Sequence, residues 1–431
     1  MNPMAVSLEP RPRPSELLSG HDHGTAAYRR LVLALMAGGL ANFSLMYFVQ
    51  PLLPLLATHY GVSAAESSHA LSVTTLTILA GSLVAGPLAD RFGRVNIMRW
   101  SLLASGGLGL ASAFAPDWAS LVMTRGLLGV TLAGLPVAAL AYLREEVRPA
   151  SHARANAGYI AGTAVGGAAG RLLPGPLAAA GGWQLAAVVI SLVTVVAGLT
   201  LWALLPPSRA FAPRPLELRT AALGTMTALR DPGVALICLV GFAAMGVMVG
   251  VYNAIAFRLQ AAPFALGEAA SLVYLAYPIG ILAPQALRRL SGRVGRGPAA
   301  VAGTALLGVG VLVTSASLLA GIVLSLGLVT FAFLGIHSVL SGWVVDRAKR
   351  RGIGTAQAAS AYLLTYYLGS TIAGALATQQ WQAHGWTGVE WLSLGLVMTA
   401  LAAALLATRA DRTAPPRPRT TDQLDLRAVT A

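Results

Sequence analysis

Three ionisable side chains lie inside long apolar stretches of the sequence, namely Arg125, Arg171 and His337. If these stretches cross a membrane, burying such groups is costly, which makes each of them a candidate functional residue. A guanidinium binds carboxylates and carbonyl groups, so two arginines facing one cavity favour an anionic or zwitterionic ligand over a lipophilic cation. Each arginine could instead bond only to backbone carbonyls and hydroxyls, and the sequence leaves that alternative open.

His337 offers a different chemistry, because an imidazole gains and loses a proton near physiological pH. We predict that it carries a proton coupled to the function of the protein, with a neutral packing histidine as the alternative. The acidic residues lie near the ends of the apolar stretches. They are Glu66, Asp117, Glu268 and Glu390 on one side, and Asp90, Glu145, Glu146 and Asp346 on the other. Neither arginine therefore has an obvious carboxylate partner at mid-depth.

Amide and phenol groups in the apolar stretches form a second set of candidates. Such groups need hydrogen-bond partners in lipid, so they should face the protein interior. We predict that they line a central cavity together with the two arginines, although any one of them could serve only to hold two helices together. These residues are Asn42, Tyr47, Gln50, Tyr252, Asn253, Tyr366 and Tyr367.

The composition places these residues in a membrane protein. Of the 431 residues, 56% are hydrophobic and 11% are charged, whereas a soluble domain carries about 25% charged residues. The net charge is +14, but the basic residues are scattered through short loops, which argues against nucleic acid as a partner. We expect a lipid bilayer, protons and a small-molecule substrate as partners, and a monomer as the working unit.

Several other chemistries lack their residue patterns. The seven histidines show no metal-ligand spacing, and the sequence has no glycine-rich loop ending in Gly-Lys-Ser or Gly-Lys-Thr. The single cysteine, Cys238, excludes an intrachain disulfide and is expected to be a packing residue. We therefore predict no metal, no cofactor, no ATP hydrolysis and no enzymatic activity.

The apolar stretches predict an all-α protein with twelve transmembrane helices. Two bundles of six, residues 29–205 and 233–408, are joined by a polar linker at 206–232 that could hold a short surface helix near 216–229. The polar tails, 1–28 and 409–431, are expected to be disordered. The predicted helices cover residues 30–58, 67–88, 97–114, 119–143, 155–180, 183–205, 233–259, 265–287, 298–318, 321–345, 355–378 and 387–408.

The basic residues predict the orientation. All but three of the 30 lie in the two tails, in the linker or in every second loop, and the exceptions are Arg125, Arg171 and Arg258. Because positively charged loops stay in the cytoplasm, this alternation predicts an even number of spans with both termini cytoplasmic. The N-terminal tail lacks the apolar core of a signal peptide, so the first helix is expected to remain as an anchor.

The loop between the second and third predicted helices, within GSLVAGPLADRFGRVNIMR at residues 81–99, has a dense pattern of glycine and charge. Residues 292–296 echo it one half-protein later, with a glycine in place of the acid. The pattern resembles the G-x-L-a-D-R-x-G-R loop of the major facilitator superfamily. The residues that carry this resemblance are Gly86, Asp90, Arg91, Gly93 and Arg94.

The resemblance implies twelve transmembrane helices in two pseudo-symmetric six-helix bundles that rock around a central site. We predict that the loop acts as a conformational lock. Asp90 would meet the N-terminal end of the helix near Gly354–Thr355 when the cytoplasmic side is closed, because the helix dipole attracts a carboxylate. Arg94 would brace the loop, and the second half, which lacks the acid, would have no matching lock.

The fifth predicted helix and four longer strings narrow the resemblance. The helix is similar to the glycine- and proline-rich fifth helix of proton-driven exporters in the superfamily, with plain helix packing as the alternative. Its residues of interest are Gly162, Gly166, Gly167, Gly170, Pro174 and Pro176. The strings YFVQPLLP, GYIAGTAVGGAAGR, HSVLSGWVVDRA and SAYLLTYYLGS resemble a branch of drug and arabinose efflux permeases of the bacterial inner membrane.

The resemblance therefore implies a secondary transporter that exports a small organic molecule in exchange for protons. Two alternatives stay open. One is an uptake permease, and the other is a non-transporting membrane sensor or assembly factor on the same fold.

Overall fold

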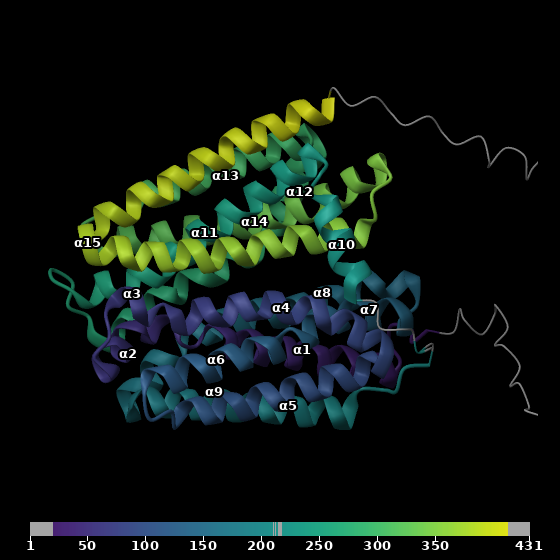
Figure 1. Ribbon diagram of the computed structural model, residues 1–431, viewed down its shortest axis with the longest axis horizontal. Helices are drawn as coiled ribbons and strands as arrows, with labels where there is room; N and C mark the ends of the chain where they lie inside the picture. Colours follow the sequence, from purple (N-terminus) through teal and green to yellow (C-terminus); the bar gives the residue numbers. More distant parts are fainter. Residues whose placement is uncertain (1–19, 210, 212, 214–217, 413–431) are drawn as a thin grey trace, which may run out of the picture.

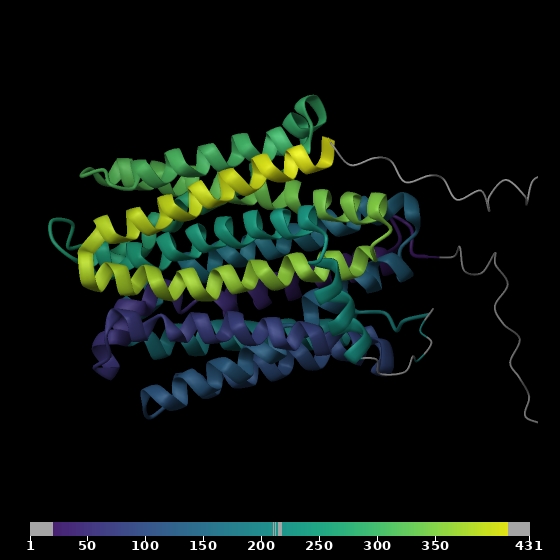
Figure 2. The ribbon, with the colours of Figure 1, turned by 45° about the horizontal axis from the view of Figure 1, so that its top comes forward.

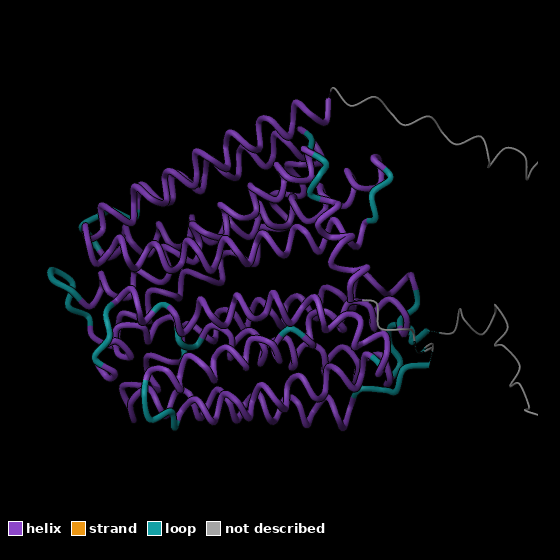
Figure 3. Tube along the Cα trace, viewed as in Figure 1, coloured by secondary structure: helices purple, strands orange, loops and turns teal. Residues whose placement is uncertain are grey.

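The computed structural model describes residues 20–209, 211, 213 and 218–412, and almost all of them lie in helices. These described residues contain no β-strand and a single β-bridge, between His21 and Val147. The loops gather at the two ends of the molecule (Figure 3). The first half contains α1 (Ala26–Tyr47), η1 (Gln50–Leu52), α2 (Leu53–Tyr60), α3 (Ala64–Ser67), α4 (His69–Phe92), α5 (Arg94–Ala113), α6 (Trp118–Leu132), α7 (Gly134–Glu146), η2 (Pro149–Ser151), α8 (His152–Leu172) and α9 (Pro174–Leu204).

The second half follows a linker helix, α10 (Leu218–Ala228), which is the short helix predicted near 216–229. It contains α11 (Pro232–Gln260), the 3-10 helix η3 (Gly267–Leu282), α12 (Ala283–Val294), α13 (Arg296–Val313), α14 (Leu319–Arg351) and α15 (Thr355–Arg412). The two halves form two separate bundles of roughly parallel helices (Figure 1).

The helices account for twelve membrane spans. Among the described residues, nine helical stretches are long and apolar enough to cross a membrane. The last of these holds two passes, because the chain leaves helical geometry at Gly385 within α15. Together with α5 and α8, the count is twelve, so the fold is an all-α membrane protein with two six-helix bundles.

The two ends of the bundles differ, and we name them for the rest of the description. The described parts of both termini and the linker helix α10 lie at one end, the terminal end (Figure 1). At the opposite end, the distal end, α2 and α3 lie beside the turn within α15 (Figures 1 and 2). Helix α10 contacts both α4 and α15, so the linker touches both bundles at the terminal end.

Proline explains why several predicted helices are interrupted. The prediction of one helix over 30–58 is wrong, because α1 ends at Tyr47 and a 3-10 turn containing Pro51 leads into α2. The predicted fourth helix divides into α6 and α7, three residues before Pro136, and the predicted fifth helix is interrupted after Leu172, just before Pro174. Its predicted end at 180 is confirmed, because the chain leaves helical geometry at Gly181 and Gly182 within α9. Proline has no N–H to donate and displaces the preceding turn, which the apolar pattern alone does not reveal.

The N-terminal segment next to α1 is ordered, contrary to the predicted disordered tail at 1–28. The backbone N–H of His21 donates to the Glu146 carbonyl over 2.7 Å, and the Asp22 carboxylate accepts from Ser151 Oγ over 2.9 Å. The Ser151 hydroxyl, with the backbone N–H of His23, holds the pKa of Asp22 below its ordinary value. Residues 1–19 and 413–431 of the two predicted tails lie outside the described residues.

The first bundle is held by close packing of α8 on α1. A Cβ added at Gly162, Gly166 or Gly170 would overlap with the α1 backbone at Met36, Leu40 or Ser44, respectively. The Ser44 hydroxyl also donates to the Gly166 carbonyl over 3.1 Å. Three glycines at four-residue spacing thus let the two backbones approach to contact distance, and this fixes where the C-terminal end of α8 meets the break after α1.

Candidate functional site

Arg171, near the C-terminal end of α8, is the centre of the site. Its side chain is only 2% exposed, and its Nε donates to the Gln50 side-chain oxygen over 2.7 Å. Its Nη1 donates to the Gly167 carbonyl, one turn back in α8, over 2.8 Å. Gln50 is the first residue of η1, and this 3-10 turn after α1 places its side chain at the guanidinium.

Three tyrosine rings surround the same guanidinium. Arg171 Cζ lies 3.7 Å from the ring centroid of Tyr47, 4.8 Å from that of Tyr277 and 5.3 Å from that of Tyr252. Each ring face attracts a cation, and more strongly where water is excluded. Gly167 leaves room for this arrangement, since a Cβ there would lie 3.1 Å from the Tyr277 hydroxyl.

The cluster crosses from one bundle to the other. Gln50 Nε2 donates to Asn253 Oδ1 of α11 over 2.7 Å, and Asn253 Nδ2 donates to the Gly374 carbonyl of α15 over 3.3 Å. Tyr252 and Tyr277 also belong to the second half. A continuous chain of hydrogen bonds therefore runs from the cation in the first bundle to the backbone of the second.

No carboxylate among the described side chains contacts Arg171. Its partners are two neutral carbonyl oxygens and three rings. The site consequently keeps a net positive charge in an apolar surrounding, which is the electrostatic requirement for attracting an anion.

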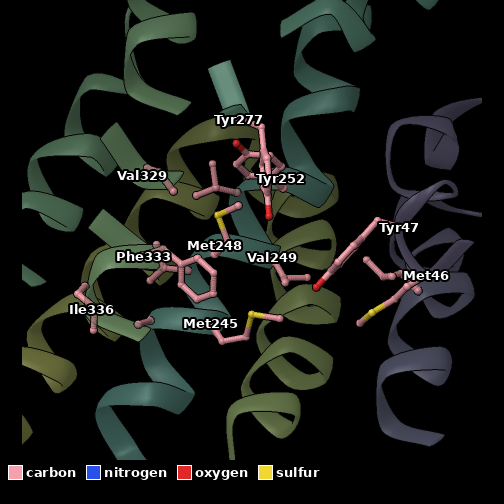
Figure 4. Close-up of a cluster of buried hydrophobic side chains, with 14 of the residues drawn as sticks. Met46, Tyr47, Met245, Met248, Val249, Tyr252, Tyr277, Val329, Phe333 and Ile336 are labelled. Atoms are coloured by element: carbon pink, nitrogen blue, oxygen red, sulfur yellow. The ribbon is translucent and has the colours of Figure 1, made fainter. Parts of the chain in front are cut away.

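Side chains of both bundles enclose this region. Met46 and Tyr47 extend from the first bundle toward Met245 and Val249 of α11 (Figure 4). Tyr274 stacks on Tyr252 with ring centroids 5.3 Å apart, and its hydroxyl donates to the Tyr252 carbonyl over 3.0 Å. The region between the bundles is thus lined by rings and thioethers.

Arg125, in α6, has different surroundings from those of Arg171. It is fully buried, and its Nε, Nη1 and Nη2 donate to the carbonyls of Ala70, Leu45 and Met46 over 3.0, 3.1 and 2.9 Å. Leu45 and Met46 are at the end of α1, where carbonyls lose their helical partners. This geometry matches the backbone-carbonyl alternative left open above: Arg125 caps α1 from within one bundle.

His337, in α14, lies in an aromatic cluster of the second bundle. Its Nδ1 is 2.8 Å from the Tyr362 hydroxyl, and its ring lies 4.9 Å from Tyr366 and 6.3 Å from Phe333 between centroids. Tyr366 contacts Tyr367 edge to face at 5.3 Å. The structure therefore brings together three residues singled out from the sequence, with rings and hydroxyls as their described partners.

Asn42, the remaining cavity candidate, is buried in α1, and its side-chain oxygen has no hydrogen-bond partner among the described residues. The Tyr159 hydroxyl of α8 is in the same situation. Buried polar atoms without partners are uncommon in folded proteins, so both are positions where a bound molecule could supply the missing bond.

The glycine- and charge-rich loop folds at the terminal end. Gly93, with φ of 93°, makes the turn between α4 and α5, a conformation that favours glycine. Arg94 contacts Asp90 over 3.1 Å and Glu145 of α7 over 2.5 Å, while Arg91 is exposed. Gly86, one turn before Asp90, faces Val137 at ordinary contact distance. In this state Asp90 is paired with Arg94 and not with Gly354–Thr355.

The second half repeats part of this arrangement. Gly295 has nearly the same φ as Gly93, 92°, and the next residue, Arg296, pairs with Asp346 of α14. The repeat therefore extends to the arginine and its acidic partner on the following long helix. Gly292 stands where the first half has Asp90.

Sequence reasoning missed a buried ion-pair network at the terminal end of the second bundle. Arg347, 3% exposed, binds Asp231 over 2.5 Å and also pairs with Asp411. Asp231 accepts from the N–H of Val234 over 2.8 Å, so it also caps α11. The sequence did indicate the capping role, because Asp231 immediately precedes a proline that begins a helix.

The hydrogen bonds that join the two bundles lie toward the distal end. Besides Gln50 and Asn253, Thr75 of α4 is 2.9 Å from Thr371 of α15 between hydroxyl oxygens. The N–H of Ala65 donates to the Gln382 side chain over 3.3 Å. The described state is therefore one in which the bundles are joined at their distal end.

The comparisons with known proteins place this two-bundle fold among membrane transporters. The family model described as Major Facilitator Superfamily matches residues 35–283. The chain therefore belongs to the major facilitator superfamily, as the loop motif predicted. Membership indicates a transporter rather than an enzyme.

Two full-length relatives are similar to this chain. The uncharacterised MFS-type transporter YybF of Bacillus subtilis is 36% identical over 379 residues, 88% of this chain and 93% of YybF. The inner membrane transport protein YnfM of Escherichia coli K12 is 36% identical over 388 residues, 90% of this chain and 92% of YnfM.

A solved structure shares the fold. The crystal structure of a bacterial homologue of the human lysosomal transporter Spinster, inward-facing and unoccupied, matches with a TM-score of 0.71 at 15% identity. The match covers 90% of this chain and 98% of that one. The prediction of a twelve-helix, two-bundle fold is confirmed.

Proposed function

We propose that this protein exports a small organic anion or zwitterion across the bacterial inner membrane in exchange for protons, by alternating access. The observation that carries the proposal is the hydrogen-bond chain from Arg171 through Gln50 to Asn253. A binding cation that is also part of the contact between two moving bundles can couple what it binds to which side is open.

The terminal end is assigned to the cytoplasm. It carries the basic loop around Arg94, the basic stretch 347–351 and the linker, and positively charged loops stay on the cytoplasmic side. Both termini are then cytoplasmic. The distal end then faces outward. Because the hydrogen bonds between the bundles lie toward this outer end, the described state is closed there, and substrate would enter from the cytoplasm.

His337 is proposed as the carrier of the coupling proton. The titratable side chains that contact it among the described residues are Tyr362, whose hydroxyl lies 2.8 Å from Nδ1, and Tyr366, whose ring centroid lies 4.9 Å from that of His337. An imidazole whose hydrogen bond runs to a hydroxyl can hold a proton in one state and release it in another.

Asp90 is proposed as the lock of the other state. When the cytoplasmic ends close, its half-exposed carboxylate would leave Arg94 and meet the N-terminal end of α15 at Gly354–Thr355. Arg91 in the same loop is exposed, so its side chain is available to contact that helix as well.

Flux into proteoliposomes under imposed pH gradients tests the proposal. Organic anions should move in the direction opposite to protons, and matched cations should not. Movement of anions with protons would instead identify an uptake permease. No substrate-dependent flux with any anion or cation of the panel would favour a sensor or assembly factor.

A further inference from the structure

We propose that Arg171, Gln50 and Asn253 form a latch that the carboxylate of the substrate releases, and that the substrates are organic monocarboxylates with an apolar or aromatic body. This inference rests on the proposed transport function and adds its substrate class and its trigger. The name latch refers to these three side chains throughout.

The latch depends on one amide that makes two bonds. The Gln50 side-chain oxygen accepts a hydrogen bond from Arg171 Nε over 2.7 Å, and its nitrogen donates to Asn253 Oδ1 over 2.7 Å. The first bond stays within one bundle, and the second joins the two bundles. Any ligand that displaces the Gln50 oxygen from the guanidinium therefore also disturbs the contact between bundles.

A carboxylate is the ligand that displaces it. A charge-assisted hydrogen bond to a carboxylate is about twice as strong as one to a neutral carbonyl, and a guanidinium can bind both carboxylate oxygens. Among the described side chains, no acid already holds this position on Arg171. A neutral or cationic molecule would gain nothing over Gln50.

The surroundings select the rest of the molecule. Tyr47 and Tyr277 lie against the guanidinium, and Met46, Met245 and Val249 belong to the same buried cluster as these two tyrosines (Figure 4). A second charge on the substrate would be buried here without a partner, which is costly. The class is therefore a single carboxylate on an apolar or aromatic body.

Apart from the latch, further hydrogen bonds join described residues of the two bundles near the distal end. The Thr75–Thr371 pair and the Ala65–Gln382 bond are neutral. Binding of the carboxylate from the cytoplasmic side would then open the distal end, and its departure would let Gln50 reform both bonds. The return to the closed distal end would take place with the coupling proton bound, as the proposed exchange requires.

Binding to purified protein tests the substrate class. The probes are benzoate and octanoate with their neutral amides, benzamide and octanamide, and benzylamine as the matched cation. The acids should bind and the amides and the amine should not. Arg171→Gln should weaken acid binding by about tenfold or more, since it removes a bond to a charged group, while Arg171→Lys, which keeps the charge, should retain part of it.

Crosslinking across the distal end tests the trigger. The variant Ala65→Cys/Gln382→Cys places one cysteine on each bundle at the distal end. Because the native Cys238 is buried, a short bifunctional thiol reagent joins the two introduced cysteines, and the crosslinking yield reports the distance between the bundles. The acids should lower the crosslinking yield, and the amides should leave it unchanged. Asn253→Leu should lower the yield without any ligand and still bind acids, because Arg171 and Gln50 remain. Thr75→Val, a matched control at another bundle contact, should keep the response to acids.

Three results would overturn the inference. One is acid binding in Arg171→Gln that is as tight as in the wild-type protein. Another is a crosslinking yield that ignores the acids, and the third is preferred binding of benzylamine. If Arg171→Gln does not fold, the Lys and Asn253→Leu variants still decide. The proposed function fails separately, when the wild-type protein moves no substrate through liposomes. Flux of acids that does not depend on the latch would refute only this inference.

Discussion

Arg125 and Arg171 are both buried arginines of the first bundle, yet they have different partners. Arg125 donates to three backbone carbonyls of its own bundle. Arg171 donates to one backbone carbonyl and to Gln50, which continues to the second bundle. Backbone carbonyls cannot leave without unfolding a helix end, whereas a side-chain amide can rotate away. The comparison indicates that the type of partner, rather than burial, distinguishes an arginine that only stabilises the fold from one that can exchange its partner for a ligand.

The two arginines also act on the same segment from opposite sides. Arg125 caps the end of α1 at Leu45 and Met46, and its guanidinium lies 5.2 Å from the Phe48 ring centroid. Arg171 lies against Tyr47 and Gln50. Arg125 thus holds the end of α1 next to the residues that contact Arg171, and we propose that any role of Arg125 in transport is indirect.

The largest expected effect is a loss of stability when Arg125 is substituted. Arg125→Gln should lower the free energy of unfolding by about 3 kcal/mol, because it leaves buried carbonyls without donors. Arg171→Gln should cost less, since Gln50 can keep its bond to Asn253. Thermal unfolding midpoints of the two purified variants check this, and a larger loss of stability for Arg171→Gln would reverse the assignment.

The second effect concerns transport. Arg171→Gln should slow flux of organic anions by about tenfold or more, because the cation that attracts them is gone. Arg125→Lys is the matched control, since it keeps a charge and some donors at the structural position. Initial rates in proteoliposomes at equal protein content check both. Equal loss in the two variants would mean that the arginines share one role.

Part of this site could be predicted from the sequence, and part could not. The apolar stretches, the alternation of basic loops and the motif around Asp90 predicted the fold. Residue types alone also selected Arg171, Gln50 and Asn253. They could not tell Arg171 from Arg125, because that difference depends on where α1 ends relative to α6. Tyr274 and Tyr277 were missed because they face the site only through the 3-10 turn of η3.

The third effect concerns His337 and tests whether proton coupling can be lost while substrate exchange is kept. His337→Gln keeps a hydrogen-bonding side chain beside Tyr362 but cannot titrate. Transport against a gradient should be lost, whereas exchange of substrate at equilibrium should continue, because the latch in the other part of the site is intact. Exchange and accumulation are measured on the same liposomes. If the variant still accumulates substrate, His337 is not the proton carrier, and Asp90 or the pair Glu145 and Glu146 would be the next candidates.

The smallest effect concerns the lock. Asp90→Asn should slow turnover a few-fold, which corresponds to the 0.3–1 kcal/mol or slightly more that a helix dipole contributes to a nearby carboxylate. Expression should be unchanged, since the Arg94–Glu145 pair remains. Gly292→Asp, at the equivalent place in the second half, asks whether an added acid there acts as a second lock. Unchanged turnover in Asp90→Asn would remove the lock from the account.

Counterflow of matched molecules tests the central claim most directly. Proteoliposomes loaded with unlabelled benzoate or benzylamine are diluted into the labelled compound, with protein-free liposomes as the control for passive permeation. The account predicts transient accumulation of labelled benzoate by the wild-type protein, none of labelled benzylamine, and a rate of benzoate accumulation lowered by about tenfold or more in Arg171→Gln. Accumulation of benzylamine that survives in Arg171→Gln would contradict it.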